Sequence, residues 1–200
     1  MMKDFILEKL RYGVNNLINE DDSSVIKGYH GTKHSINKFK FTNVPDARNQ
    51  EGPGIYFTIN YDSAKTYAGE GGYVYTVDLT PKKLLRNVPL EKVDKKILKD
   101  EVVSLIKMAP NWKQIALNYG DTVDEGLDGM LYKYIDNSRI KRQVFISVFE
   151  DLYRNNPDAY VKNMVKLGYD GVYLKSKDGS KDNYAIYNPS VIKLVKTEKI

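Results

Sequence analysis

The chain contains no cysteine. That absence excludes a disulfide framework, a thiol nucleophile and every zinc site with sulfur ligands. Histidine is almost as scarce, because His30 and His34 are the only two in 200 residues. A histidine-rich metal site is therefore not expected either, and we predict that no metal takes part in the chemistry.

Long apolar runs are also absent. No uninterrupted apolar stretch approaches the ~18 residues that indicate a membrane span. Asp4 and Glu8 interrupt the apolar start of the chain, which argues against a secretory signal. Together with the missing cysteines, these features predict a soluble cytoplasmic protein that has no membrane partner.

The common phosphate-binding and calcium-binding loops are missing. No Gly-x-x-x-x-Gly-Lys-Ser/Thr segment occurs, and the glycine-rich residues 69–72 precede an expected strand instead of opening a helix. The acidic residues 121–128 lack the spacing of a calcium loop. The net charge of +5 is spread along the chain, which favours a solvated surface but leaves an acidic or nucleic-acid partner open.

The remaining sequence is typical of one mixed α+β domain. Hydrophobic residues make up 42% and aromatic residues 12%, which is enough for a packed core. Apolar residues at helical spacing predict an amphipathic helix over 3–18 and an all-helical insert over 91–167. The flanking segments 27–80 and 169–195 have strand texture, so their strands must pair over a long sequence separation in a split mixed or antiparallel sheet.

The local elements of the β-rich segments follow from short apolar runs and their punctuation. A short helix is expected over 62–68, with Asn60 or Asp62 as its cap and Gly69 at its end. The polar loop 42–53 is expected to lie over a groove. The expected strands cover residues 28–32, 54–58, 73–79, 169–175, 183–187 and 191–195.

Four segments carry a resemblance to a known family. They are Tyr-His-Gly-Thr at 29–32, Gly-Pro-Gly-Ile-Tyr-Phe-Thr at 52–58, Ser-Ala-Lys-Thr-Tyr-Ala at 63–68 and Asp-Asn-Tyr-Ala-Ile-Tyr-Asn-Pro-Ser-Val-Ile-Lys at 182–193. In this order, with Tyr67 eleven residues after Tyr56, they resemble the His-Tyr-Glu ADP-ribosyltransferases of the diphtheria-toxin and poly(ADP-ribose)-polymerase type. The chain looks closest to the small transferase domains of phage-encoded and polyvalent mobile-element proteins, which implies a bacterial or phage-infected cell.

The resemblance implies NAD+ as co-substrate and a role for each matching residue. His30 would hydrogen-bond ribose hydroxyls, and the Gly31 backbone, followed by Thr32, would bind the nicotinamide amide. Tyr67 would stack on the nicotinamide, and Tyr56 would line the same pocket as the tyrosine of the triad. The resemblance thus predicts that these side chains and the third triad residue line one cleft.

The third triad position falls on Asn183, where most members of the family have glutamate. Breaking the nicotinamide–ribose bond builds positive charge on the ribose, and a carboxylate stabilises such charge. One unit charge at ~4 Å and an effective dielectric near 20 is worth ~4 kcal/mol, so its loss could slow the reaction up to about a thousandfold. Asp182 faces the other side of its strand, whereas Asp178 on the preceding loop could supply the charge.

The leading interpretation is a mono-ADP-ribosyltransferase, an NAD+-dependent glycosyltransferase that modifies a macromolecule. A protein acceptor is favoured over a nucleic acid. Two alternatives stay open, a catalytically silent NAD-binding or interaction module and an NAD+ glycohydrolase that uses water as acceptor. A basic nucleic-acid-binding domain comes last, because no reader motif occurs.

Overall fold

The computed structural model describes residues 25–41, 52–176 and 182–200. The expected helix over 3–18, most of the loop 42–53 and Asp178 lie outside these residues. The elements are β1(Ile26–Thr32), β2(Ile55–Thr58), α2(Tyr61–Ala68), β3(Tyr73–Leu79), β4(Leu84–Leu85), η1(Leu90–Lys92), α3(Lys95–Lys107), α4(Trp112–Ala116), α5(Val123–Leu131), η2(Tyr132–Asp136), α6(Lys141–Leu152), α7(Pro157–Lys166), β5(Gly171–Leu174), β6(Asn183–Ile186), η3(Pro189–Val191) and β7(Ile192–Lys199).

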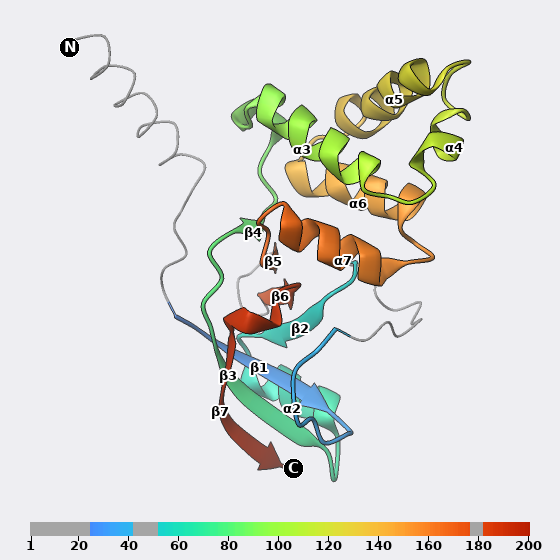
Figure 1. The fold of residues 1–200 in the computed structure, drawn as a ribbon. Coiled ribbons are helices and arrows are strands. Elements are labelled where there is room, and N and C mark those ends of the chain that lie inside the picture. Colours follow the sequence, from blue (N-terminus) through green and yellow to red (C-terminus); the bar gives the residue numbers. More distant parts are fainter. Residues whose placement is uncertain (1–24, 42–51, 177–181) are drawn as a thin grey trace, which may run out of the picture.

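The strands form one mixed sheet in the order β4-β5-β6-β2-β1-β3-β7 (Figure 1). All neighbouring strands run antiparallel except β4 and β5, which are parallel. Strands from the two β-rich segments pair with each other, β2 with β6 and β3 with β7. This confirms the α+β fold class predicted from the sequence.

The sheet has a weak seam between β1 and β2. β1 pairs with β3 along its whole length, from Ile26 opposite Leu79 to Thr32 opposite Tyr73. It pairs with β2 at a single position, where Tyr29 lies opposite Thr58. Beyond this pair the two halves of the sheet diverge, as expected for a split sheet.

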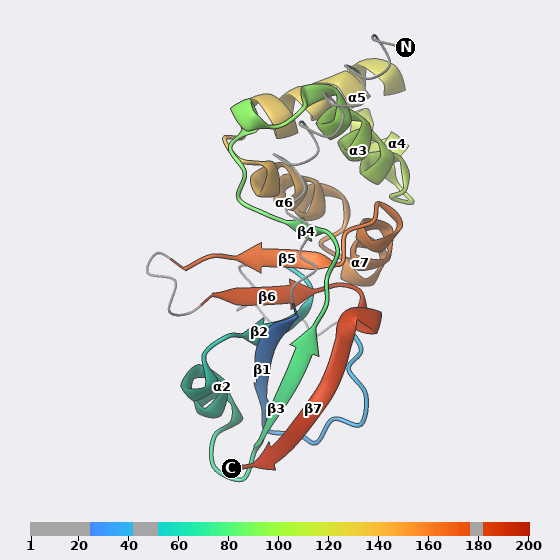
Figure 2. The same cartoon turned by 90° about the vertical axis from the view of Figure 1, so that its left-hand side faces the viewer.

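The helices lie in two places. The helix α2 covers one face of the β1–β3 half, whereas α3 to α7 stack beyond the β4–β5 edge (Figure 2). One core cluster joins these later helices to Val172, Leu174 and Ala185 of β5 and β6. A second cluster, which includes Phe57 and Val77, lies on the opposite face of the sheet.

The ends of the helices follow from their capping residues. The Asn60 side chain accepts a hydrogen bond from the Ser63 amide and starts α2, and Asp94 accepts from the amides of Lys96 and Ile97 at the start of α3. The helix α7 begins at Pro157 behind the cap Asn156. It stops before Gly168, whose φ of 85° suits glycine. No helix in the described part of the chain is long and apolar enough to cross a membrane.

Several short elements, among them β4, η2 and the 3-10 turn η3, were not predicted from the sequence. The strand β4 has only two residues and pairs in parallel with β5, and such a short segment has no periodicity to read. The π-helical turn η2 extends α5 where a plain α-helix was expected. In addition, β7 continues to Lys199, four residues beyond the predicted strand.

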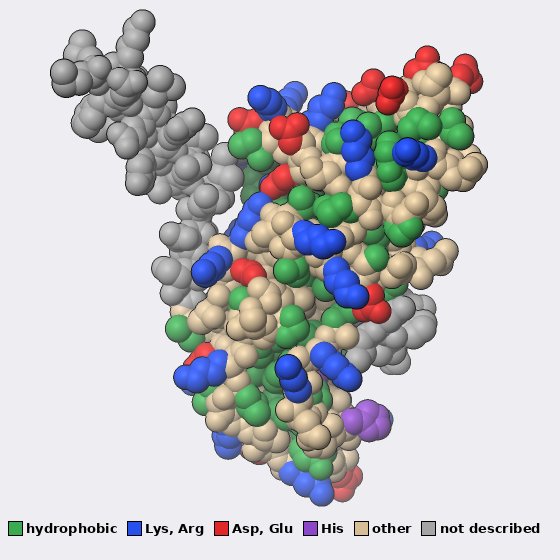
Figure 3. All heavy atoms as spheres, viewed as in Figure 1, with side chains coloured by type: hydrophobic (Ala, Val, Ile, Leu, Met, Phe, Trp, Pro, Cys, Tyr) green, Lys and Arg blue, Asp and Glu red, His purple; other side chains and the backbone are tan. Residues whose placement is uncertain are grey.

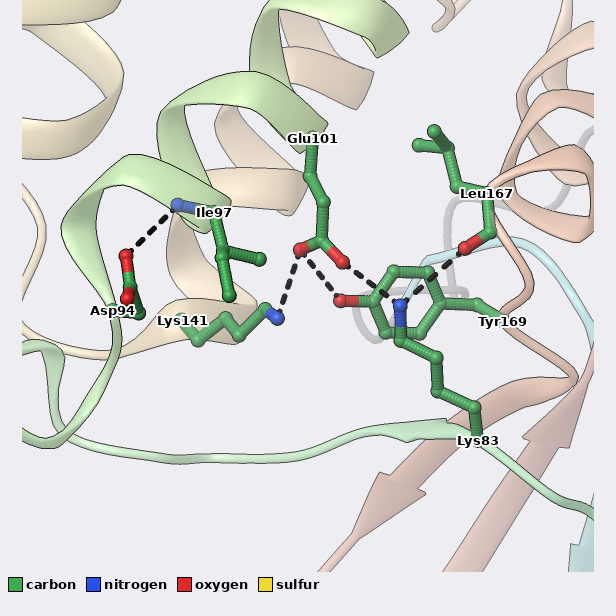
Figure 4. Close-up of polar contacts among 7 residues, drawn as sticks. All are labelled: Lys83, Asp94, Ile97, Glu101, Lys141, Leu167 and Tyr169. Atoms are coloured by element: carbon green, nitrogen blue, oxygen red, sulfur yellow. Dashed lines mark hydrogen bonds and ion pairs between the residues drawn. The ribbon is translucent and has the colours of Figure 1, made fainter. Parts of the chain in front are cut away.

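Basic side chains are scattered over both the helical part and the sheet on the face drawn in Figure 3. Two lysines take part in a polar network between the two parts (Figure 4). Glu101 of α3 accepts hydrogen bonds from Lys83 Nζ at 2.8 Å and the Tyr169 hydroxyl at 2.9 Å. It also pairs with Lys141 of α6 at 2.9 Å. This network ties the helices to the chain segments that lead into β4 and β5.

Candidate functional site

The register of the strands assigns the candidate side chains to the two faces of the sheet. Thr58 of β2 lies opposite both Tyr29 of β1 and Asn183 of β6. Side chains of directly opposed residues share a face, and successive residues alternate between faces. Tyr56, Thr58 and Asn183 therefore share the face that carries α2, whereas Phe57 and His30 belong to the other face.

Tyr56 and Asn183 are close neighbours on their common face. Tyr56 lies opposite Ala185, so Asn183 is its diagonal neighbour, a relation that typically spans about 7–8 Å. The Tyr56 hydroxyl donates a hydrogen bond to the Gly52 carbonyl, and its half-buried ring packs against the core below the helices. The structure thus brings these two predicted site residues together.

His30 lies at the seam where β1 and β2 diverge. Its Nδ1 is 2.7 Å from the Tyr56 carbonyl oxygen, and because a carbonyl only accepts, Nδ1 must carry the proton. Burial lowers the pKa of His30 by more than the bond to this carbonyl raises it, so the ring is neutral at pH 7. Among the described residues Nε2 has no hydrogen-bond partner, and it presents a lone pair as an acceptor.

The expectation that all the site side chains line one cleft is not met on a single face. The His30 ring packs with Phe39 at 5.7 Å and with Phe57 at 5.7 Å between centroids, on the face opposite Asn183. The reason is the register, which sequence alternation within one strand cannot supply. The hydrogen bond from His30 Nδ1 to the Tyr56 carbonyl is the contact that links His30 to the strand of Tyr56, and the roles assigned to these residues stay predictions.

Gly31 and Thr32 have local structural partners. A Cβ added to Gly31 would lie 1.8 Å from the Ala64 carbonyl oxygen. On this side of the strand, therefore, the backbone of α2 packs closely against Gly31, where the sequence predicted a ligand. The Thr32 hydroxyl accepts a hydrogen bond from the His34 amide at 3.2 Å. These contacts place the strand end and the helix next to the seam.

Tyr67 is the exposed aromatic side chain of α2. It is 76% exposed, whereas Tyr61 of the same helix donates to Glu198 of β7 at 2.7 Å and packs edge-on against Tyr29. An exposed ring of this size is available to stack on a flat ligand. In Figure 2, α2 lies on the same side of the molecule as the C-terminal end of β5 and the N-terminal end of β6.

Asp182 does not provide the missing carboxylate beside Asn183. It accepts hydrogen bonds from the Tyr173 hydroxyl at 2.5 Å and the Ser176 amide at 2.9 Å. Burial raises the pKa of Asp182, but these bonds outweigh it and hold the pKa below its usual range. Asp182 therefore holds the ends of β5 and β6 together from the other face, as the alternation predicts.

Sequence analysis missed Thr58 as a member of this site. Thr58 is a polar residue with only 7% exposure, and its hydroxyl accepts from the Asn60 amide at 3.1 Å. Thr58 lies opposite Asn183 in the sheet, and its hydrogen bond to Asn60 joins it to the start of α2. Its position two residues after Tyr56 was the available signal, because such residues share a face.

The sheet is mixed and has a seam, and at the seam the neutral His30 lies beside the Tyr56 carbonyl. The sequence resemblance predicts an NAD+ site in this part of the sheet. Residues 21–199 match the family model described as ADP-ribosyltransferase in polyvalent proteins, and the chain belongs to this family. No curated protein matches the sequence. The chain is similar to a solved structure described as an anti-CRISPR protein, at 13% identity and a TM-score of 0.37, over 90% of this chain and 99% of the other.

Proposed function

We propose that this chain is a mono-ADP-ribosyltransferase, which cleaves NAD+ and transfers ADP-ribose to a macromolecular acceptor. Membership of the ADP-ribosyltransferase family supports the reaction class. The observation that carries the proposal is the state of His30. Its Nδ1 donates to the Tyr56 carbonyl, which leaves Nε2 as an acceptor for a ribose hydroxyl of NAD+.

The other residues of the proposed site have complementary tasks. The exposed ring of Tyr67 would stack on the nicotinamide, and Tyr56 would bound the pocket from the next strand. The amide of Asn183 would orient the ribose hydroxyl nearest to the bond that breaks. Nicotinamide leaves with the bonding electron pair, and an acceptor nucleophile attacks the ribose carbon and gives up its proton.

Transfer of a single ADP-ribose is favoured over chain synthesis by Asn183. In related enzymes elongation depends on a glutamate at this position, and here the residue is asparagine. A protein acceptor is the preferred partner, because no nucleic-acid reader motif occurs in the sequence.

A second function is favoured by the same residue. Asn183 brings no charge to the ribose, and within the described chain the neighbouring carboxylate Asp182 is bound on the other face. A site of this kind could bind NAD+ without cleaving it. The alternative is therefore a catalytically silent NAD-binding module.

Labelled NAD+ distinguishes these functions. The purified chain is incubated with adenylate-labelled NAD+ and bacterial lysate, and the products are digested with protease or with nuclease. A transferase gives a macromolecular label that protease removes, together with free nicotinamide. Free nicotinamide without a labelled macromolecule would indicate a glycohydrolase. The absence of both free nicotinamide and labelled macromolecule would refute the enzymatic proposal. His30→Ala should abolish both products, whereas His34→Ala serves as the matched control.

A further inference from the structure

A groove lies on the face of the sheet opposite α2, between residues 36–39 and the segment that contains η3 and β7. It has a volume of about 360 Å³. Ile192 and Leu194 are paired with Leu79 and Val77, so their side chains point to this face. The groove is lined by Ile36, Asn37, Lys38, Phe39, Pro189, Ser190, Ile192 and Leu194.

The walls of the groove are mainly apolar and partly open to solvent. Leu194 is 48% exposed. Together with Ile36, Phe39 and Ile192 it forms an apolar lining that is open to solvent, and a contiguous exposed apolar surface of this kind marks an interaction site. The strand β7 is the last in the sheet. Its outer edge therefore has no strand partner within the described residues.

The borders of the groove are basic. Residues 25–41 contain four lysines and no acidic residue, and residues 189–200 contain three lysines and one glutamate. That glutamate, Glu198, already pairs with Lys196 at 2.6 Å. Figure 3 shows apolar side chains between basic ones over this part of the molecule. Lys38 lines the groove, and Lys33, Lys40 and Lys199 belong to the segments that border it. The strand register turns Lys27, Lys193 and Lys196 to the face that carries α2.

We propose that this groove binds an acidic, extended segment of a protein partner through one apolar anchor side chain. The apolar walls would bury the anchor, and the lysines would attract the acidic residues on either side of it. A nucleic acid is disfavoured because neither bordering segment contains arginine, the residue best suited to phosphate contacts. The walls are also mainly aliphatic, whereas single-stranded nucleic acids bind aromatic platforms.

The proposal goes beyond the NAD+ reaction and does not depend on it. The groove lies on the other face from Tyr56, Asn183 and α2. The groove contacts His30 of the proposed NAD+ site through the edge-on packing of Phe39. The Ile36 amide also donates to the Tyr75 hydroxyl, and the Tyr75 ring packs near His30. Binding at the groove can nevertheless be measured without NAD+.

Peptide selection tests the proposal directly. A random dodecapeptide library displayed on phage is selected on the full chain, and enriched peptides are synthesised and titrated by fluorescence anisotropy. The matched variants are Leu194→Glu, which alters the groove, and Val195→Glu, which does not line it but is similarly exposed at 53%. Both substitutions add the same charge at neighbouring exposed positions, so folding should be equally preserved.

We expect enriched peptides that contain several Asp or Glu residues around one large apolar residue. Leu194→Glu should weaken their binding at least ten-fold, and Val195→Glu less than three-fold. Lys38→Glu should weaken binding more than Lys65→Glu on α2. No enrichment, or equal binding to the two matched variants, would overturn the proposal. Tighter binding of a 20-nucleotide single-stranded DNA that is lost in Leu194→Glu would overturn it in favour of a nucleic-acid site.

Discussion

Asn183 lies beside Tyr56 and Thr58 but brings no charge to the place where the ribose would become cationic. We predict that Asn183→Glu raises nicotinamide release from NAD+ about ten-fold, because a carboxylate restores part of the lost charge interaction. The gain stays below a thousandfold because glutamate is one methylene longer. Asn183→Ala should lower release, since the orienting hydrogen bond is lost. Chromatography of free nicotinamide measures the release by the unaltered protein and by both variants.

Asn183→Gln is the control for length, because it has the size of glutamate without its charge. It should not reproduce the gain. If Asp178 already supplies the charge, Asn183→Glu would bring two carboxylates together and give no increase, and Asp178→Asn would then be the damaging change. Nicotinamide release that is indifferent to every one of these substitutions, in folded protein, would favour the silent module.

Among the described glycines, Gly31 leaves the least room for an added Cβ. An added Cβ would lie 1.8 Å from the Ala64 carbonyl oxygen and 3.0 Å from the Ala68 amide nitrogen, both backbone atoms. We predict that Gly31→Ala lowers the free energy of unfolding by about 3 kcal/mol without NAD+ present. Urea denaturation followed by circular dichroism measures this loss.

Gly28 on the same strand is the comparison for that experiment. Its added Cβ would meet side-chain atoms at 3.1 to 3.4 Å, which can shift, so Gly28→Ala should cost about 1 kcal/mol. Equal losses for the two glycines would mean that α2 can move away from β1. In that case the tight contact between α2 and the seam would not be a fixed part of the site.

Between elements, the Glu101 network holds α3 and α6 against the segments that lead into β4 and β5. Burial raises the pKa of Glu101, but Lys141 and Lys83 outweigh it and hold the pKa below its usual range. We predict that Glu101→Gln lowers the free energy of unfolding by about 2 kcal/mol at pH 7. The loss is below that for a fully buried pair because Lys83 is 36% exposed.

The pH dependence of this loss has a definite sign. A carboxyl whose pKa is depressed by folding stabilises the protein above its unfolded pKa, and that contribution disappears as the pH falls through the folded value. The difference between the unaltered protein and Glu101→Gln should thus be full at pH 7 and shrink below about pH 4. Asp100→Asn, one residue earlier and exposed, should show no such change. A difference that is constant with pH would exclude an ionic role for Glu101.

The elements themselves could largely be predicted from the sequence. Apolar spacing and caps located α2 and β3 to within a few residues and gave the insert over 91–167 as helical, because these signals are local. β4 could not be predicted, since two leucines make a strand only by pairing with β5. Nor could the face of His30 relative to Asn183 be predicted. It depends on two registers, that of β1 with β2 and that of β2 with β6, and the second joins Thr58 to Asn183, 125 positions apart in the chain.

On the scale of the whole molecule, the seam connects a half-sheet that carries α2 to a half-sheet that carries the helical insert. The proposed NAD+ site spans this seam, with His30 on β1 and Tyr56 and Asn183 on β2 and β6. A ligand held by both halves binds only the folded chain, and it must then stabilise the whole fold by mass action.

The melting temperature in the presence of NAD+ tests this account most directly. At a concentration ten times its dissociation constant, NAD+ should stabilise the protein by about 1.4 kcal/mol and raise the melting temperature by about 3 °C. His30→Ala should lose most of this rise, whereas His34→Ala, altered at the exposed histidine, should keep it. Each rise is measured against the same variant without ligand. No rise in the unaltered protein at millimolar NAD+ would contradict the proposed site.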